Sequence, residues 1–239
     1  MKSLVWLRND LRMDDNPALK NACINSEEVH CIYIYSHDQM KLHNEANCKI
    51  EFVIKNLKYL NNSLQKIRIP LTVIYSDGFN DNPKKILDTV KERSISKVFW
   101  NNMFGEDENI RDSKVKDILN LNNISFESFD DQVVYPPGTI KTNEDKPYSV
   151  FTPFKRKWIE NFDLDFLDIE FKYTAKKESN IKSNVNNISF DKAHSVDMSI
   201  WPSGEEKALS KLSDYLDSKV IRYAKDRNDP ILEGTRRIS

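Results

Sequence analysis

The sequence predicts an α/β fold for residues 1–130: a Rossmann-like open parallel sheet with helices on both faces. Short runs rich in β-branched and aromatic residues, bounded by polar residues, are typical of buried strands. Such runs cover residues 3–7, 29–35, 71–75, 97–101 and 123–129. Amphipathic helical patterns lie between the runs, and strict alternation of strand and helix favours a parallel sheet with right-handed crossovers.

The first helix is expected soon after the strand at residues 3–7. Asn16 directly precedes Pro17, which is the combination of an N-cap residue and a first-turn proline. The intervening turn, residues 8–17, contains no glycine. It therefore lacks the G-x-G-x-x-G pattern that lets a dinucleotide-binding domain approach a pyrophosphate, which disfavours a plain NAD-binding domain.

Three further helices are expected in this domain. The longest covers residues 46–67, because apolar residues recur there at three- and four-residue steps. Two shorter amphipathic segments lie around residues 86–90 and 110–119. Each falls between two predicted strands, as the alternation requires.

After residue 130 the sequence changes character twice. Residues 131–164 combine many turn residues with more aromatic side chains than a tether needs, so we interpret them as an aromatic-rich extension of the α/β domain. Residues 165–200 are polar, weakly periodic and rich in asparagine, which predicts a long interdomain linker lying over the surface. The aromatic residues of the extension include Tyr135, Tyr148, Phe151, Phe154 and Trp158.

A new helical element is expected in residues 201–239. Ser203 and Glu206 have the spacing of a capping box. An apolar stripe with helical spacing follows, made of Leu209, Leu212, Leu216, Val220 and Tyr223. Only sixteen residues follow Tyr223, too few to supply partner helices, so we expect a helical domain that is truncated after its first helix.

Composition and motifs exclude several classes of protein. The net charge of −1 means that nucleic acid would have to be held by a local basic patch. Three cysteines without a C-x-x-C pair argue against a disulfide framework and a zinc site. There is no H-E-x-x-H or G-x-S-x-G motif, and no apolar run approaches the ~18 residues of a membrane span. We expect a cytoplasmic protein with no metal site and no membrane contact.

Charged residues cluster at two turns. Arg8, Asp10 and Arg12 follow the first strand, at the edge where open α/β sheets bind ligands. An ion-pair network that fixes the loop is the favoured interpretation, and ligand contact is the alternative. Asp107 and Glu108 open a predicted helix, where carboxylates favour the helix dipole; ligand binding is again the alternative.

The last residues are locally basic. From Lys219 to Ser239, six basic residues stand against three acidic ones. Gly234 permits a strained turn, and the hydroxyl groups of Thr235 and Ser239 are suited to phosphate if a helix begins there. From these residues alone, a phosphate-binding turn and a solvated basic tail both remain open.

Three stretches resemble the DNA photolyase/cryptochrome family in order and spacing, and together they reach across nearly the whole chain. They are LVWLRNDLRMDDNPAL at residues 4–19, KPYSVFTPFKRKW at 146–158 and YAKDRNDPILEGTRRIS at 223–239. The resemblance is to the amino-terminal half of class I cyclobutane pyrimidine dimer photolyases. It implies an antenna domain, a linker and the first helix of an all-helical FAD domain, in a monomer that acts on damaged DNA as the full-length protein.

The resemblance also implies flavin and DNA contacts near the end of the sequence. Tyr223 resembles the family's early flavin-domain tyrosine, and Arg227 resembles an arginine near the DNA lesion. The segment that holds the FAD phosphates corresponds to Thr235, Arg236, Arg237, Ile238 and Ser239.

A second cofactor is implied in the α/β domain. His43, Asp107 and Glu108 resemble the contacts to the folate antenna, 5,10-methenyltetrahydrofolate, in the bacterial class I enzymes. Asp107 replaces a common asparagine of the family, and Gly105 replaces a common glutamate. The resemblance therefore implies two cofactors, FAD and an antenna folate.

The implied reaction is light-driven repair of cyclobutane pyrimidine dimers by electron transfer from reduced FAD to a flipped-out lesion. No side chain acts as an acid or base in it, so no catalytic residue is expected. The 239-residue chain by itself is expected to retain no flavin and to repair no DNA. Two alternatives remain: a cryptochrome blue-light photoreceptor, and a free-standing α/β module that binds a nucleotide or a pterin.

Overall fold

The computed structural model describes residues 1–163, 173–187, 201–229 and 231–232. Its centre is a five-stranded parallel sheet with the strand order β3-β2-β1-β4-β5. The chain reverses its direction of winding between β3 and β4, so the carboxyl ends of β1 and β4 flank the topological switch point of the sheet. The strands are β1 (Lys2–Leu7), β2 (Glu28–Ser36), β3 (Leu71–Ser76), β4 (Lys97–Asn101) and β5 (Ser125–Phe129).

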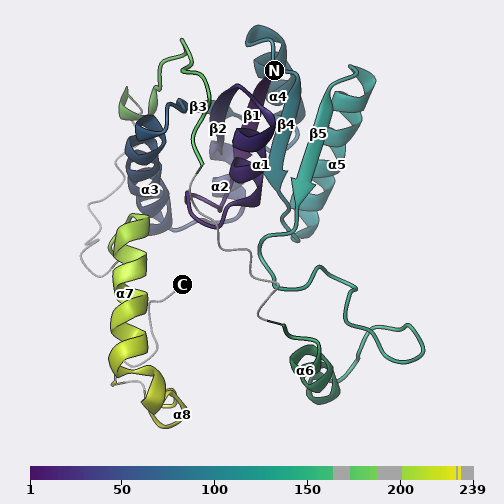
Figure 1. Cartoon of the computed structure of the whole chain (residues 1–239), viewed down its shortest axis with the longest axis vertical. Coiled ribbons are helices and arrows are strands. Elements are labelled where there is room, and N and C mark those ends of the chain that lie inside the picture. The colour runs from purple at the N-terminus through teal and green to yellow at the C-terminus, as the bar shows by residue number, and fades with distance from the viewer. Residues whose placement is uncertain (164–172, 188–200, 230, 233–239) are drawn as a thin grey trace.

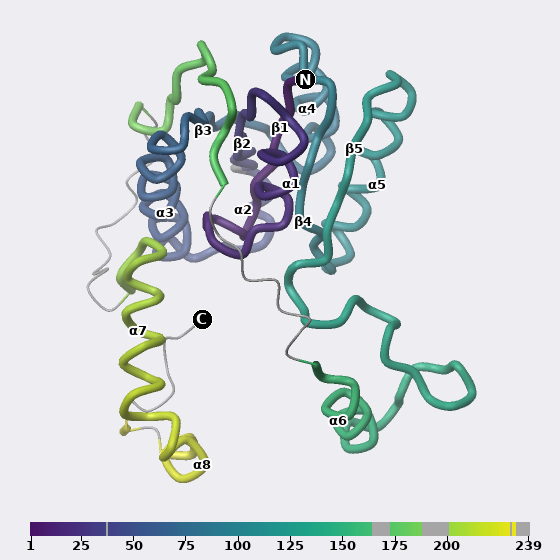
Figure 2. Tube along the Cα trace, in the orientation of Figure 1, coloured from purple at the N-terminus to yellow at the C-terminus, as the bar shows by residue number. Residues whose placement is uncertain are grey.

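Helices cover both faces of the sheet, as the alternating pattern predicts (Figures 1 and 2). Val5 and Leu7 of β1 pack with α1 (Pro17–Asn25) and α3 (Asn47–Lys66). Leu4 and Trp6, which point to the opposite face, pack with α4 (Asn82–Glu92) and α5 (Glu106–Leu121). The two faces of one strand thus supply two cores, and the predicted fold class is confirmed.

Two helix N-caps were predicted, and the structure confirms one of them. Asn16 caps α1, because its Oδ1 accepts a hydrogen bond from the Leu19 amide at 3.1 Å. The capping box at Ser203 and Glu206 is wrong: α7 (Glu205–Ser218) begins after Gly204, and no side chain caps it. Gly204 has φ +102°, a conformation that glycine adopts without strain, so backbone geometry and not a serine hydroxyl begins this helix.

Two helices were not predicted. The six-residue α2 (His37–Leu42) lies between β2 and α3 and is too short to show an apolar period. The other is α6 (Phe151–Glu160) in the aromatic-rich extension, which projects beyond the carboxyl ends of the strands (Figure 1). Its aromatic rings pack locally, with Trp158 stacked on Phe162 at a centroid distance of 5.2 Å.

The apolar stripe of α7 is exposed in the structure, as the sequence predicts. Leu209 and Leu216 are 52% and 53% exposed, and α7 contains no buried residue. The stripe continues through η3 (Val220–Arg222) into α8 (Tyr223–Asp226). None of the helices in the described ranges combines the length and the apolar character that a membrane crossing requires.

Part of the predicted linker packs against the α/β core. Ala175 and Val185 are each only 1% exposed and join the apolar cluster beneath α3. Between them the chain passes beside β3, where the Asn184 side chain takes the hydrogen-bonding place of a neighbouring strand. Its Oδ1 accepts from the Val73 amide at 2.7 Å, and its Nδ2 donates to the Val73 carbonyl at 2.9 Å. Residues 173–187 therefore cover an edge of the sheet.

Replacing Asn184 by alanine is expected to lower the free energy of unfolding by about 1–3 kcal/mol, because two hydrogen bonds at ~0.5–1.5 kcal/mol each are lost. Urea unfolding followed by circular dichroism measures the change. Asn186→Ala, an exposed asparagine two residues away, is the matched control and should stay within about 0.5 kcal/mol of the parent. Equal losses in the two variants would contradict the role given to Asn184.

Candidate functional site

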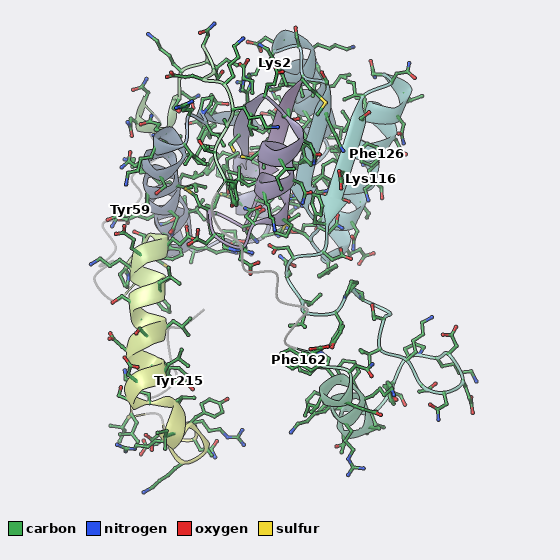
Figure 3. The ribbon with its side chains drawn as sticks, in the orientation of Figure 1. Lys2, Tyr59, Lys116, Phe126, Phe162 and Tyr215 are labelled. Atoms are coloured by element: carbon green, nitrogen blue, oxygen red, sulfur yellow. The ribbon has the colours of Figure 1, made fainter. Side chains whose placement is uncertain are left out.

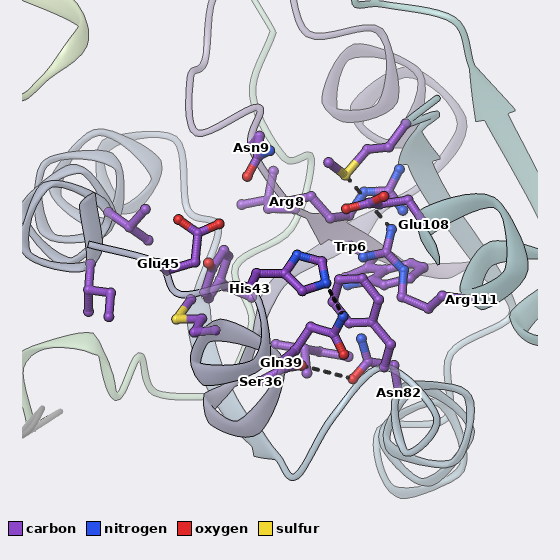
Figure 4. Close-up of a pocket in the computed structure, with 18 of the residues that line it drawn as sticks. Trp6, Arg8, Asn9, Ser36, Gln39, His43, Glu45, Asn82, Glu108 and Arg111 are labelled. Atoms are coloured by element: carbon purple, nitrogen blue, oxygen red, sulfur yellow. Dashed lines mark hydrogen bonds between the residues drawn. The ribbon is translucent and has the colours of Figure 1, made fainter. Parts of the chain in front are cut away.

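A pocket of about 160 Å³ opens at the carboxyl ends of β1 and β2 (Figure 4). α2 and α3 contribute side chains to one wall, and the starts of α4 and α5 contribute to the other. This is the edge where open α/β sheets bind ligands, beside the point where the strand order reverses. The fold therefore places the pocket where a ligand is expected.

Arg8, the first residue after β1, forms part of the pocket floor. Its side chain is only 6% exposed, and Nη1 lies 3.4 Å from Asp112 Oδ2. Nε and Nη2 have no hydrogen-bond partner among the described residues, although the guanidinium lies over the Trp6 ring at 4.5 Å. Burial lowers the pKa of Arg8 to about 10, with Asp112 opposing the shift, so the group remains charged at neutral pH. It offers two buried donors to a ligand.

Arg111 of α5 lies beside Arg8 and is held differently. Its guanidinium is between two aromatic rings, 4.7 Å from the centre of Trp6 and 4.6 Å from that of Phe79. Nε and Nη2 contact Asp112 Oδ1 at 2.9 and 2.8 Å. Asp112 thus serves two arginines, and this buried group of three charges carries a net charge of +1. A partly unpaired cation of this kind favours an anionic ligand.

The three residues of the predicted antenna site gather at the mouth of this pocket. His43 follows α2, and its Nε2 lies 3.3 Å from Asp107 Oδ2 on α5. Gln39 Nε2 contacts the same ring nitrogen at 2.7 Å, and Phe79 meets the imidazole edge to face at 6.4 Å. Glu108 lines the pocket one residue beyond Asp107 (Figure 4). Residues separated by more than sixty positions in the sequence therefore share one rim.

Glu108 folds back over Gly105, the residue before α5. A Cβ atom added at Gly105 would lie 2.0 Å from Glu108 Oε2. The backbone of Gly105 has φ −65°, which any residue adopts, so the space and not the conformation requires glycine here. The missing side chain at position 105 makes room for the Glu108 carboxylate.

The charged cluster after β1 divides into two roles. Asp10 Oδ1 accepts from the Arg8 amide at 2.7 Å, and Oδ2 accepts from Asn101 Nδ2 at 2.6 Å. Arg12 pairs with Asp131 at 2.7 and 2.9 Å. The favoured interpretation, an ion-pair network that fixes the loop, is confirmed for Arg12, whereas Asp10 holds the loop through hydrogen bonds. Arg8, in contrast, faces the pocket.

Two of the predicted flavin and DNA contacts, Tyr223 and Arg227, are described, and neither lines this pocket. Tyr223 opens α8, beyond the far end of α7, and is 43% exposed (Figure 1). The Arg227 guanidinium lies 6.0 Å from the centre of the Tyr223 ring. The remaining predicted FAD residues lie outside the described residues: Thr235, Arg236, Arg237, Ile238 and Ser239.

Sequence reasoning missed several residues of the pocket. Arg111, which lines the pocket, and Asp112, which pairs with it, lie on the same face of α5 as the buried residues Val115 and Leu119. Charged residues at inward positions of an amphipathic helix are rare unless they are paired or bind something, so this pattern was a usable signal. No such signal existed for Gln39 and Met40, which are placed by the unpredicted α2.

Metal chemistry has no visible support in this part of the chain. Within the described ranges, no group of three or more His, Cys, Asp or Glu side chains is arranged to hold a metal ion. The pocket offers aromatic rings, two guanidinium groups and carboxylates instead. These are groups that bind a planar, partly anionic organic molecule.

Comparisons with known proteins agree on one family. The family model described as DNA photolyase matches residues 3–175. The deoxyribodipyrimidine photo-lyase of Escherichia coli (strain K12) is 31% identical over 243 residues, covering 99% of this chain and 50% of that protein. The deoxyribodipyrimidine photo-lyase of Salmonella typhimurium is 28% identical, with 99% and 50% covered.

A solved structure extends the agreement to the fold. A bacterial class III photolyase from Agrobacterium tumefaciens superposes with a TM-score of 0.80 at 26% identity, covering 98% of this chain and 48% of that one. The chain thus spans about half the length of the curated relatives it matches.

Proposed function

Because the chain belongs to the DNA photolyase family, we propose that it serves light-driven repair of cyclobutane pyrimidine dimers in DNA and that its α/β domain holds a light-harvesting folate. The relatives named photo-lyases are about twice as long, so repair is proposed for a protein that carries this chain together with the rest of the family's length. The observation that carries the folate assignment is that His43 and Glu108 line one pocket while Asp107 contacts His43 at its rim.

The chemistry of the pocket suits 5,10-methenyltetrahydrofolate. A pterin ring is planar and carries N–H donors, which the carboxylates of Asp107 and Glu108 complement. The glutamate end of a folate is anionic, and Arg8 presents two buried donors without partners. Trp6 and Phe79 add aromatic surface on either side of Arg111. Bound in this pocket, the folate would supply light absorption.

FAD is proposed to bind through the end of the sequence. Tyr223 presents an exposed ring, and the hydroxyl and guanidinium groups of Thr235, Arg236, Arg237 and Ser239, with the backbone at Ile238, are suited to its phosphates. Arg227 is proposed to contact DNA, with an affinity that falls as salt rises. FAD supplies the photochemical electron in this proposal, so these residues need only bind and orient.

A direct titration tests the folate site. The 239-residue chain is mixed with 5,10-methenyltetrahydrofolate, and binding is followed by the quenching and shift of its near-ultraviolet absorption and fluorescence. We expect saturable binding with one folate per chain, reduced by Glu108→Gln. Signals that grow linearly without saturation would reject the pocket as a folate site.

Repair is tested separately on the longer protein. An oligonucleotide with a single thymine dimer is illuminated with the reduced holoenzyme, and a dark sample serves as the control. Loss of the dimer in the light alone supports the repair function. Light-dependent spectral changes with the dimer left intact would favour a cryptochrome photoreceptor instead. The 239-residue chain alone is expected to show no retained flavin and no repair.

Gly105→Ala is expected to weaken folate binding about as much as Glu108→Ala, because the new Cβ displaces the Glu108 carboxylate. A lost hydrogen bond to a charged group corresponds to about ten- to hundred-fold in affinity. The free energy of unfolding should change by less than about 0.5 kcal/mol, since only a flexible side chain has to move. In the double variant the two losses should not add. Full additivity would show that Gly105 acts independently of Glu108.

A further inference from the structure

Three segments outside the α/β core bond to the same short loop between β1 and α1. Asp131, at the start of the aromatic-rich extension, pairs with Arg12. The Tyr173 hydroxyl donates to the carbonyl of Met13. Glu205, the first residue of α7, bonds to the backbone of the same loop. The loop of residues 8–16 is therefore a common anchor for segments that are far apart in the sequence.

The Glu205 contact is two-pronged. Its Oε2 accepts from the Met13 amide and its Oε1 from the Asp14 amide, both at 2.9 Å. Two successive backbone N–H groups that converge on one carboxylate form a small anion-binding nest. Hydrogen bonds to an ionised acceptor are roughly twice as strong as neutral ones, so this is the strongest polar contact seen between α7 and the α/β domain in the described residues.

The loop is already shaped to receive that carboxylate. Asp10 Oδ1 holds the Arg8 amide at 2.7 Å, and Asn16 Nδ2 donates to the Arg12 carbonyl at 3.1 Å. Arg12 also donates to the carbonyl of Asp15, which has φ +50°. The two amides are thus positioned by bonds within the loop, and they point at a partner that comes from elsewhere.

A second contact pins the residue before Glu205. The Gly204 amide donates to Asn56 Oδ1 of α3 at 2.9 Å. Tyr59 lies where α3 meets α7 (Figure 3). Its ring covers Gly204 so closely that an added Cβ would lie 3.1–3.3 Å from its atoms. Residue 204 is therefore held by α3, and residue 205 is held by the loop of residues 8–16. Beyond this joint α7 extends away from the sheet (Figure 1), and none of its residues is buried.

We infer that Glu205 is a positioning residue: its bond to the Met13 and Asp14 amides sets the direction in which α7 leaves the α/β domain. The functional consequence rests on the proposed function, because α7 precedes, in the sequence, the segment proposed to bind FAD. Energy transfer between two chromophores depends on their distance and relative orientation. A joint that holds α7 at one angle therefore holds an antenna at a fixed geometry relative to the flavin.

The direction of α7 can be measured without any chromophore. Spin labels are placed on Asp117→Cys in α5 and Ser213→Cys in α7, both exposed positions, in a Cys48→Ser background; Cys23 and Cys31 are buried. Electron–electron double resonance then gives the distance distribution between the labels in the 239-residue chain. Glu205→Gln is expected to broaden this distribution at least twofold, because an amide cannot accept both N–H groups as a carboxylate does.

Glu206→Gln is the matched control, since it removes the same charge from the same exposed helical turn. It should leave the distribution unchanged. Glu205→Asp keeps the charge but shortens the side chain, and an intermediate width is expected; it also serves if Glu205→Gln fails to fold, as judged by circular dichroism. A parent-like distribution in a folded Glu205 variant would overturn the proposal.

A negative folate titration would reject the folate site, whereas a negative distance measurement would reject the role of Glu205 in positioning α7. Broadening in Glu205→Gln supports the joint even if the chain binds no folate. Where folate and flavin both bind the longer protein, Glu205→Gln is expected to reduce energy transfer from folate to flavin with the affinity for each unchanged. Unchanged transfer in that protein would overturn the proposed role in orientation.

Discussion

Arg8→Met is expected to weaken folate binding about ten- to hundred-fold while leaving the protein as stable as the parent or more stable. The guanidinium is 6% exposed and has two nitrogens without partners, so the folded protein bears the cost of burying a poorly paired charge. Methionine fills similar space without that cost, and Asp112 keeps Arg111 as its partner. A residue that destabilises the fold but favours a ligand is typical of a binding site.

Two measurements on the same samples test this: urea unfolding for stability and folate titration for affinity. Arg12→Met is the control, because Arg12 is on the same loop but pairs with Asp131 away from the pocket. It should lose stability and keep its affinity, the opposite of Arg8→Met. Parent-like folate binding by Arg8→Met would remove Arg8 from the site.

The central fold was predictable because its signals are local. Each strand is a short apolar run, and α3 shows a regular apolar period through twenty residues. These patterns arise directly from burial on a sheet face or a helix stripe, so they are visible without knowledge of the partners. The Asn16 cap and the Pro17 start are local in the same sense.

Two features that were missed, the start of α7 and the side-chain partner of β3, depend on distant contacts. Gly204 begins α7 because Asn56 and Tyr59 of α3 receive it, and neither residue is near it in the sequence. Asn184 replaces a strand partner for Val73 across more than a hundred residues. A pattern of spacings within one segment does not contain this information, which is why a polar linker sequence concealed two buried side chains.

The rim of the candidate site was predictable from the sequence, but the arginine pair at its floor was not. His43, Asp107 and Glu108 were predicted from family resemblance, and in the structure His43 and Glu108 line one pocket while Asp107 contacts His43. The arginine pair was not predicted as a unit, because Arg8 and Arg111 become neighbours only when α5 packs beside β1. Whether the rim binds folate stays a prediction for the titration.

Asp112→Ala is expected to have a larger effect on stability than a single change at any residue that lines the pocket. The carboxylate is the only anion seen in contact with both buried guanidinium groups among the described residues, at 3.4 Å from Arg8 and 2.8 Å from Arg111. Removing one partner from a buried ion pair leaves uncompensated charge and costs about 3–5 kcal/mol. Here two like charges are left side by side near the Trp6 ring, so the upper end of that range is expected.

Urea unfolding measures this loss, and Asp117→Ala, an exposed aspartate on the same helix, should stay within about 0.5 kcal/mol of the parent. The decisive sample is the double variant Arg8→Met with Asp112→Ala. Because one of the two unpaired cations is gone, part of the lost stability should return, and the two effects should fail to add. A double variant that is less stable than Asp112→Ala alone would show that Asp112 stabilises the fold by some means other than balancing these two charges.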